Sequence, residues 1–203
     1  MDIFRQMTDA ELEKAYTEVF REAFPPQELK PLESIRKMTE GGFYRPCALF
    51  RDGEAVGFMC LWLNEPYILI DYLCVPKGIR NGGIGAQMLR LVRETHPENT
   101  VFIGEVEAPT GNPEEDALIL RRLGFYARSG AVTIGYDTAL FGVHYKTIVW
   151  TNGEIDEEEI LRRHDEIYRR WFTPEMYELA IQIPLHEGEE PRVFSEWIED
   201  RKV

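Results

Sequence analysis

The sequence predicts an α/β domain built around a strand–helix–strand unit. Residues 67–75 form an apolar run of β-forming side chains, and a glycine-rich turn leads from it into the helical pattern of 84–94. Residues 101–107 have the pattern of the next strand. A strand, a helix and a strand in this order form a right-handed parallel crossover. With 203 residues, the chain has the length of one domain with an appendage.

Two helices and a hairpin are predicted ahead of this unit. Thr8 and Glu11 have the spacing of a capping box, which marks the start of a helix. The pair Asp52-Gly53 lies between two β-rich runs and is a hairpin turn signal. The predicted elements are helices over 8–23 and 31–40 and strands over 48–50 and 55–63.

After the strand–helix–strand unit, the sequence pattern predicts a short helix, two closing strands and then a charged extension. We expect residues 1–150 to form the domain and 151–203 to be a C-terminal helical extension packed on it, because 151–203 has too few large apolar residues for a core of its own. The predicted elements are a helix over 114–123, strands over 132–136 and 144–150, and helices over 156–171 and 174–180. The aromatic residues that either dock the extension or form a homodimer interface are Trp150, Tyr168, Trp171, Phe172 and Tyr177.

Composition and charge narrow the class of partner. The formal net charge of −13 argues against nucleic acid or an anionic membrane, because both carry charge of the same sign. The acidity either keeps the protein soluble or steers a cationic substrate towards it. Cys47, Cys60 and Cys74 lie in apolar strand-like runs without metal-ligand spacing. We therefore expect buried free thiols, a cytoplasmic location and no bound metal.

The glycine-rich turn 80–86 predicts an anion site. It connects a strand end to a helix N-terminus, so its backbone N–H groups and the helix dipole converge on one point. Glycines let a phosphate approach the backbone closely. The spacing is neither that of the dinucleotide fingerprint nor that of a Walker P-loop. We expect Lys77 and Arg80 to supply local positive potential.

The motif Arg80-x-x-Gly83-x-Gly85, behind a strand that ends at Val75, resembles the acetyl-CoA signature of the GNAT family of N-acetyltransferases. A second landmark is 117–125, which is similar to the family's helix that ends in Gly-Phe. The resemblance covers roughly residues 1–150. It implies a GNAT-like mixed, mostly antiparallel sheet with central parallel strands that splay apart, flanked by helices.

The resemblance also implies where acetyl-CoA binds as cosubstrate. The pantetheine arm would lie in the splay and hydrogen-bond to the backbone of Leu73, Cys74 and Val75. The pyrophosphate would bind backbone N–H groups of the turn and the helix start, which are those of Arg80, Asn81, Gly82, Gly83, Ile84, Gly85 and Ala86.

One residue departs from the family pattern. The tyrosine that often protonates the departing thiolate would fall at position 120, which is Leu120. A leucine has no proton to donate, so another residue acts as the acid or the thiolate leaves unaided. Tyr126 is the first candidate, on the strand side of Gly124-Phe125, and Tyr136 and Tyr145 are further ones.

Two carboxylates are candidate bases, because an attacking amine must lose a proton to become nucleophilic. Asp71 lies inside an apolar strand, on the face of Val75 if the strand is regular. It either acts on the amine, pairs with a nearby arginine or caps a bulge. Glu105 lies on the neighbouring strand and shares a face with Glu107. Glu105 either acts as the base or binds a cationic substrate.

The sequence thus predicts an enzyme that moves an acetyl group from acetyl-CoA to an amine of a small molecule by direct attack. The alternative is a non-catalytic acyl-CoA-binding sensor or interaction module of GNAT shape. The acceptor amine is not identified. The histidines suggest no metal site and no nucleophilic triad, and His164 falls on the apolar side of the helix predicted over 156–171.

Overall fold

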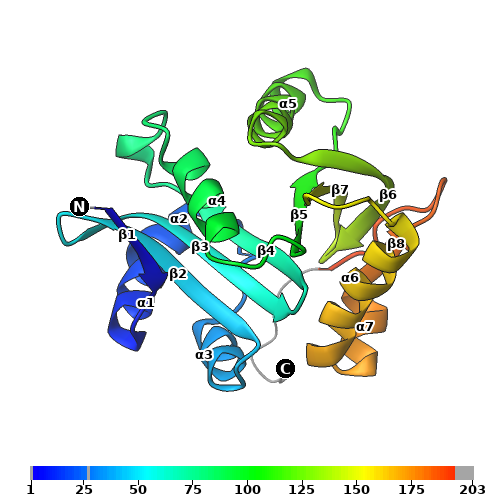
Figure 1. Ribbon diagram of the computed structural model, residues 1–203. Helices are drawn as coiled ribbons and strands as arrows, with labels where there is room; N and C mark the ends of the chain where they lie inside the picture. Colours follow the sequence, from blue (N-terminus) through cyan, green and yellow to red (C-terminus); the bar gives the residue numbers. More distant parts are fainter. Residues whose placement is uncertain (1, 27, 195–203) are drawn as a thin grey trace.

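The computed structural model describes residues 2–26 and 28–194. In this part of the chain eight strands form one mixed sheet with helices on both faces (Figure 1). Along the sheet the strand order is β1-β2-β3-β4-β5-β7-β6-β8. The strands are β1 (Asp2–Gln6), β2 (Tyr44–Arg51), β3 (Glu54–Asn64), β4 (Tyr67–Cys74), β5 (Val101–Glu107), β6 (Val132–Leu140), β7 (Val143–Trp150) and β8 (Ile181–Leu185). The α-helices are α1 (Asp9–Ala15), α2 (Arg21–Ala23), α3 (Leu32–Glu40), α4 (Ile84–Glu94), α5 (Pro113–Arg128), α6 (Glu157–Trp171) and α7 (Pro174–Ala180).

The predicted fold class is confirmed. Neighbouring strands run antiparallel except for β4 and β5, which are joined through α4 and pair in parallel. This parallel pair lies at the centre of the sheet, between β3 and β7. The strand–helix–strand unit therefore places the turn before α4 at the sheet's central opening.

A separate apolar core covers each face of the sheet. On one face, α4 and the end of α5 pack through residues such as Ile84, Met88 and Phe125. We call this the α4/α5 face. On the other face, α1, α3, α6 and α7 pack over a larger core. We call this the α1/α6 face, and the side chains of the candidate site divide between the two.

Most predicted elements are present, with shifted ends. The capping box at Thr8 and Glu11 is confirmed, and the first helix continues into α2 through a π-helical turn over Tyr16–Phe20. Edge strands β1 and β8 are additional elements. The predicted end of α5 at residue 123 is wrong. The helix continues to Arg128 because Leu123, Phe125 and Tyr126 pack against the core of the α4/α5 face.

A β-bulge in β4 changes the face on which Asp71 lies. Cys60 pairs with Tyr72 and Leu61 pairs with Ile70, so Asp71 is the extra residue. Its carboxylate points to the α1/α6 face, whereas Val75 packs on the α4/α5 face. The expectation that Asp71 and Val75 share a face is therefore wrong, because a bulge resets the alternation of a strand.

The described chain after residue 150, as far as residue 194, includes a helix and a strand that pack on or extend the same sheet. Tyr168 and Trp171 of α6 contact the rings of Trp62 and Phe43, with centroids 6.2 and 5.2 Å apart. Strand β8 then pairs with β6 and adds an edge strand. Trp150, one of the residues expected to dock the extension, instead belongs to the core of the α4/α5 face.

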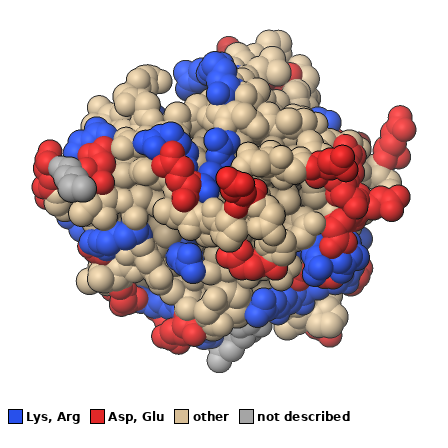
Figure 2. Space-filling view, in the orientation of Figure 1, with Lys and Arg blue, Asp and Glu red and all other residues tan. Residues whose placement is uncertain are grey.

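Basic and acidic side chains are both spread over the face shown in Figure 2, and acidic ones gather at its right-hand edge. The described helices include none with the length and apolar character needed to cross a lipid bilayer.

Candidate active site

The centre of the candidate site is the point where β4 and β5 part. Their parallel pairing runs from Tyr67 with Val101 to Ile70 with Gly104 and stops there. Asp71 and Glu105 are the first residues beyond the last pair. In Figure 1 the ribbons of β4 and β5 run in different directions. The opening leaves backbone N–H and C=O groups of both strands available to an extended ligand.

The glycine turn forms the N-terminus of α4 next to this opening. Asn81 and Gly83 have positive φ values of 68° and 76°, and Gly83 is the helix N-cap without a side-chain cap. The N–H groups of the first helical turn have no intrahelical partner. They and the helix dipole therefore favour an anion. A Cβ on Gly85 would lie 3.1 Å from the ring of Phe125, so this glycine allows α4 and α5 to approach each other.

The two basic residues of the turn already have partners. Arg80 Nε donates a hydrogen bond of 2.9 Å to the carbonyl oxygen of Val75, at the end of β4. Lys77 forms an ion pair of 2.7 Å with Glu22. Arg80 therefore stabilises the turn and keeps its charge beside it, whereas the charge of Lys77 is compensated by Glu22.

Asp71 is part of a buried ion pair. Lys30 Nζ lies 2.8 Å from Asp71 Oδ1, and the two side chains are 3% and 5% exposed. The Tyr44 hydroxyl donates to Oδ2 of the same carboxylate. Burial and the neighbouring Asp71 raise the pKa of Tyr44 well above its usual range, so this phenol keeps its proton. Asp71 thus pairs with a lysine, not with the arginine considered from the sequence, and it does so at a bulge.

Glu105 is bound from the opposite side of the opening by α6. Its Oε1 lies 2.8 Å from His164 Nε2, and its Oε2 accepts a hydrogen bond of 2.8 Å from the Tyr168 hydroxyl. Burial raises the pKa of Tyr168 first, followed by the charges of Glu105 and Asp71. Both carboxylates therefore lie within electrostatic range of this hydroxyl, on the α1/α6 face.

Glu28 is a site residue that the sequence analysis did not predict. It lies in the connection between α2 and α3, and its Oε2 accepts a hydrogen bond of 2.8 Å from the Tyr145 hydroxyl. Burial raises its pKa, and the charge of Glu107 acts in the same direction. Glu28 follows Phe24-Pro25-Pro26 in the sequence, and no local pattern distinguishes it from an exposed loop carboxylate.

Tyr126 lies on the α4/α5 face of the sheet, whereas the carboxylates of Asp71 and Glu105 lie on the α1/α6 face. It belongs to helix α5, not to the strand side of Gly124-Phe125 as expected, and its ring packs edge-on against Trp150 at 5.7 Å. Burial raises its pKa to about 12, and Cys74 is among the groups whose charge acts on it. Cys74 is a free, buried thiol whose pKa burial raises to about 12, so it remains protonated and is a poor nucleophile.

Beyond the end of β5, a hollow of about 530 Å³ opens between α5 and the β6–β7 turn. Its walls include Leu118, Ile119 and Val143, and its charged lining includes Glu107 and Arg122. These two side chains form an ion pair. Both also act on the pKa of Glu28, so the hollow lies near the carboxylates of the opening.

Comparisons with known proteins agree with this architecture. A putative GNAT acetyltransferase from Bacteroides thetaiotaomicron superposes with a TM-score of 0.67 at 23% identity, over 83% of this chain and 97% of the other. The ribosomal-protein-S18-alanine N-acetyltransferase from Escherichia coli gives 0.53 at 15% identity, over 77% and 97%. An aminoglycoside 6'-N-acetyltransferase complexed with coenzyme A gives 0.53 at 12%, over 76% and 99%. At these identities the likeness concerns the fold alone.

Sequence comparison gives the family. No curated protein sequence matches the chain. Residues 9–125, however, match the model of the Acetyltransferase (GNAT) family. The matched range includes the glycine turn, the parallel strands and α5 as far as Phe125. The chain therefore belongs to the GNAT acetyltransferase family.

Proposed function

We propose that this protein transfers an acetyl group from acetyl-CoA to the amine of a small molecule by direct attack. The observation that carries the proposal is the opening between β4 and β5, which has an anion-binding helix N-terminus beside it and a buried carboxylate on each strand. The turn residues from Arg80 to Ala86 would hold the pyrophosphate, and the backbone of Leu73, Cys74 and Val75 the pantetheine arm. Acetyl-CoA supplies an activated acetyl thioester at the opening.

The arrangement of the side chains favours Glu105 as the base. Asp71 is compensated by Lys30, so taking a proton would break a buried ion pair. Glu105 accepts hydrogen bonds from His164 and Tyr168, and no described lysine or arginine forms an ion pair with it. An acceptor ammonium would give its proton to Glu105 and then attack the thioester carbonyl. A backbone N–H near Val75 would stabilise the developing oxyanion.

Tyr126 is suited to the complementary role of proton donor. Its pKa of about 12 keeps the phenol protonated at neutral pH. It lies on the α4/α5 face, whereas Glu105 lies on the α1/α6 face. The proton of the amine and the proton for the departing thiolate would therefore be handled by different residues on the two faces of the opening.

The first test is amine-dependent release of thiol from acetyl-CoA against a panel of small amines. We expect release with at least one amine, and a fall in kcat of about 10²–10⁴-fold in Glu105→Gln. Acetyl-CoA affinity, measured by calorimetry, should not change in this variant. Glu94→Gln is the control, since Glu94 is exposed on α4 and pairs with Arg90. Full activity in Glu105→Gln would refute the assignment of the base.

The cosubstrate site has a separate test. Arg80→Ala should weaken acetyl-CoA binding about tenfold, because a charge-assisted contact and a support of the turn are lost together. Arg90→Ala, on the exposed side of α4 beyond the turn, should leave the dissociation constant unchanged. Equal affinities in the two variants would mean that the turn does not bind the cosubstrate.

One observation favours a second function, that of an acyl-CoA sensor. Leu120 occupies the position at which the family often has a tyrosine that acts as the general acid, and its side chain is 58% exposed. Acetyl-CoA binding without thiol release across the whole amine panel would support the sensor. Thiol release with any amine would exclude it.

A further inference from the structure

The carboxylate of Glu105 has a hydrogen-bond donor on each oxygen, and both donors come from α6. We propose that α6 is part of the active site, in which His164 and Tyr168 orient the carboxylate of Glu105 as the base. This inference rests on the proposed function. It concerns positioning residues, since His164 and Tyr168 act through Glu105 and not on the reacting atoms.

The side chain of Glu105 is buried beside His164. The His164 side chain is 0% exposed and that of Glu105 is 9% exposed. The two contacts of 2.8 Å, from His164 Nε2 and from the Tyr168 hydroxyl, engage both carboxylate oxygens. The two donors fix the orientation of the carboxylate. An ionised carboxylate has about four acceptor sites, so lone pairs of Glu105 remain for the proton of the acceptor amine.

Tyr136 contacts the other ring nitrogen of His164. Its hydroxyl lies 3.1 Å from His164 Nδ1. If Nδ1 carried the proton of a neutral imidazole, the lone pair of Nε2 would face the Glu105 carboxylate. The alternative, in which Tyr136 donates to Nδ1, leaves the proton on Nε2, where it can donate to Glu105. The chain Tyr136–His164–Glu105 therefore has one arrangement that satisfies a charged carboxylate and a neutral imidazole.

Charged and titratable groups surround this chain from several elements. His164 contacts Glu105 of β5, Tyr136 of β6 and Tyr168 of its own helix. The charge of Glu157 acts on Tyr136, and those of Asp71 and Tyr145 act on Tyr168. Burial raises the pKa of Tyr136, which therefore remains a donor.

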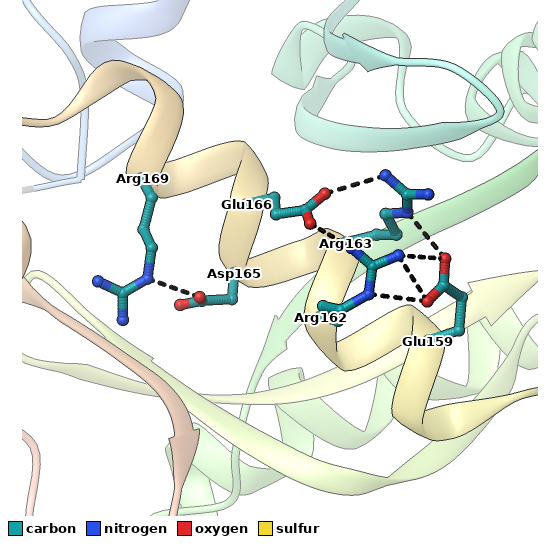
Figure 3. A network of polar contacts seen from close by, with 6 residues as sticks. All are labelled: Glu159, Arg162, Arg163, Asp165, Glu166 and Arg169. Carbon is teal, nitrogen blue, oxygen red and sulfur yellow. Dashed lines mark hydrogen bonds and ion pairs between the residues drawn. The ribbon is translucent and has the colours of Figure 1, made fainter.

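Helix α6 buries Ile160 and Ile167 beside His164 and Tyr168 on its inner face. Its outer face carries the ion-pair network of Figure 3, in which Glu159 binds Arg162 and Arg163. A buried imidazole costs free energy that an apolar side chain would not. A polar residue at position 164 is thus unexplained by packing and explained by its contact with Glu105.

The matched family region ends at residue 125, so both positioning residues lie outside it. A base on a central strand of the family region would then depend on a later segment of the same chain. This extends the role of α6 beyond covering the sheet.

The test compares His164→Leu with His164→Gln in the full-length protein. His164→Leu removes the donor to Oε1 and lets the carboxylate turn away from the acceptor amine. It should therefore lower kcat about tenfold, while KM for the amine and the dissociation constant of acetyl-CoA change little. The amide of His164→Gln can donate to Oε1 and should restore part of kcat.

Two tyrosine variants separate positioning from packing. Tyr136→Phe leaves the Glu105 contacts in place and removes the hydroxyl beside His164 Nδ1, so it should lower kcat by less than His164→Leu does. Tyr177→Phe is the control, because Tyr177 of α7 donates to Asp165 of α6 and not to His164 or Glu105. A wild-type kcat in both His164 variants, or an equal loss in Tyr177→Phe, would overturn the proposal.

The orientation of the Glu105 side chain is a readout independent of turnover, and it distinguishes this proposal from the proposed function. In crystal structures the carboxylate should leave its wild-type orientation in His164→Leu and keep it in His164→Gln. If the orientation changes in this way but the protein releases no thiol with any amine, the acetyl transfer is refuted and the positioning stands. An unchanged orientation in His164→Leu would refute the positioning whatever the activity.

Discussion

Lys30 and Asp71 form the most deeply buried ion pair of the site. Lys30 Nζ also lies 5.1 Å from the centre of the Tyr72 ring and 5.7 Å from that of Trp62. Removing two charges from water is costly, and their attraction offsets this cost only when both are present. The pair therefore stabilises the bulge of β4 as a unit, and either charge alone would destabilise it.

Asp71→Asn should consequently lower the free energy of unfolding by about 3–5 kcal/mol, because it leaves the Lys30 ammonium buried without its counter-charge. Urea denaturation measures the change. The double variant Lys30→Met with Asp71→Asn should regain much of the loss. If the single and double variants are equally unstable, the cost is one of packing and not of charge.

Glu28 predicts a pH dependence of stability. Burial raises the pKa of this carboxyl in the folded protein, so folding disfavours its charged form. The sign follows from proton linkage: the cost is absent below the ordinary pKa of glutamate and is fully present above the raised pKa. Glu28→Gln should therefore be the more stable protein at neutral pH, and the two should converge in acid. Thermal unfolding across pH measures this, and a difference that grows in acid would contradict it.

At the scale of elements, the sequence pattern predicted the helices and strands whose bounds depend on local interactions. The range of β5 is as predicted, and α4 begins and ends where its amphipathic pattern does. The bulge at Asp71 could not be predicted, because it depends on the register of β4 against β3. The contact of His164 with Glu105 spans 59 positions. The helical pattern placed His164 on the inner face of its helix, but no periodicity identifies what a helix packs against.

The turn before α4 offers a test of backbone geometry. Both Gly82 and Gly83 have room for a Cβ, with the Ile79 carbonyl oxygen 3.5 Å from that of Gly82. Only Gly83 has a positive φ, of 76°. Gly83→Ala should cost about 1–2 kcal/mol of stability, because an L-residue is strained in this conformation. Gly82→Ala should cost clearly less. Urea unfolding of the two variants measures the difference, and equal costs would mean that the turn can change its conformation.

At the scale of the whole molecule, the site combines three parts that are distant in the sequence. The parallel strands supply the opening, the α2–α3 connection supplies Glu28 and Lys30, and α6 supplies the partners of Glu105. The acidic side chains of the opening have the same sign as the net charge of −13. The net negative charge of the protein therefore attracts a cationic acceptor at long range, and the carboxylates of the opening attract it at short range.

The salt dependence of kcat/KM should show whether the net charge steers the acceptor or only keeps the protein soluble. Raising the salt concentration from about 0.01 M to about 1 M shortens the Debye length from about 30 Å to about 3 Å. At saturating acetyl-CoA, kcat/KM for a diamine should fall several-fold over this range, while kcat stays constant, because screening weakens encounter and leaves the buried contacts unchanged. A zwitterionic amino acid, which has no net charge, is the matched acceptor and should show little change. If kcat/KM for both acceptors responds equally to salt, the acidity of the chain does not select its substrate.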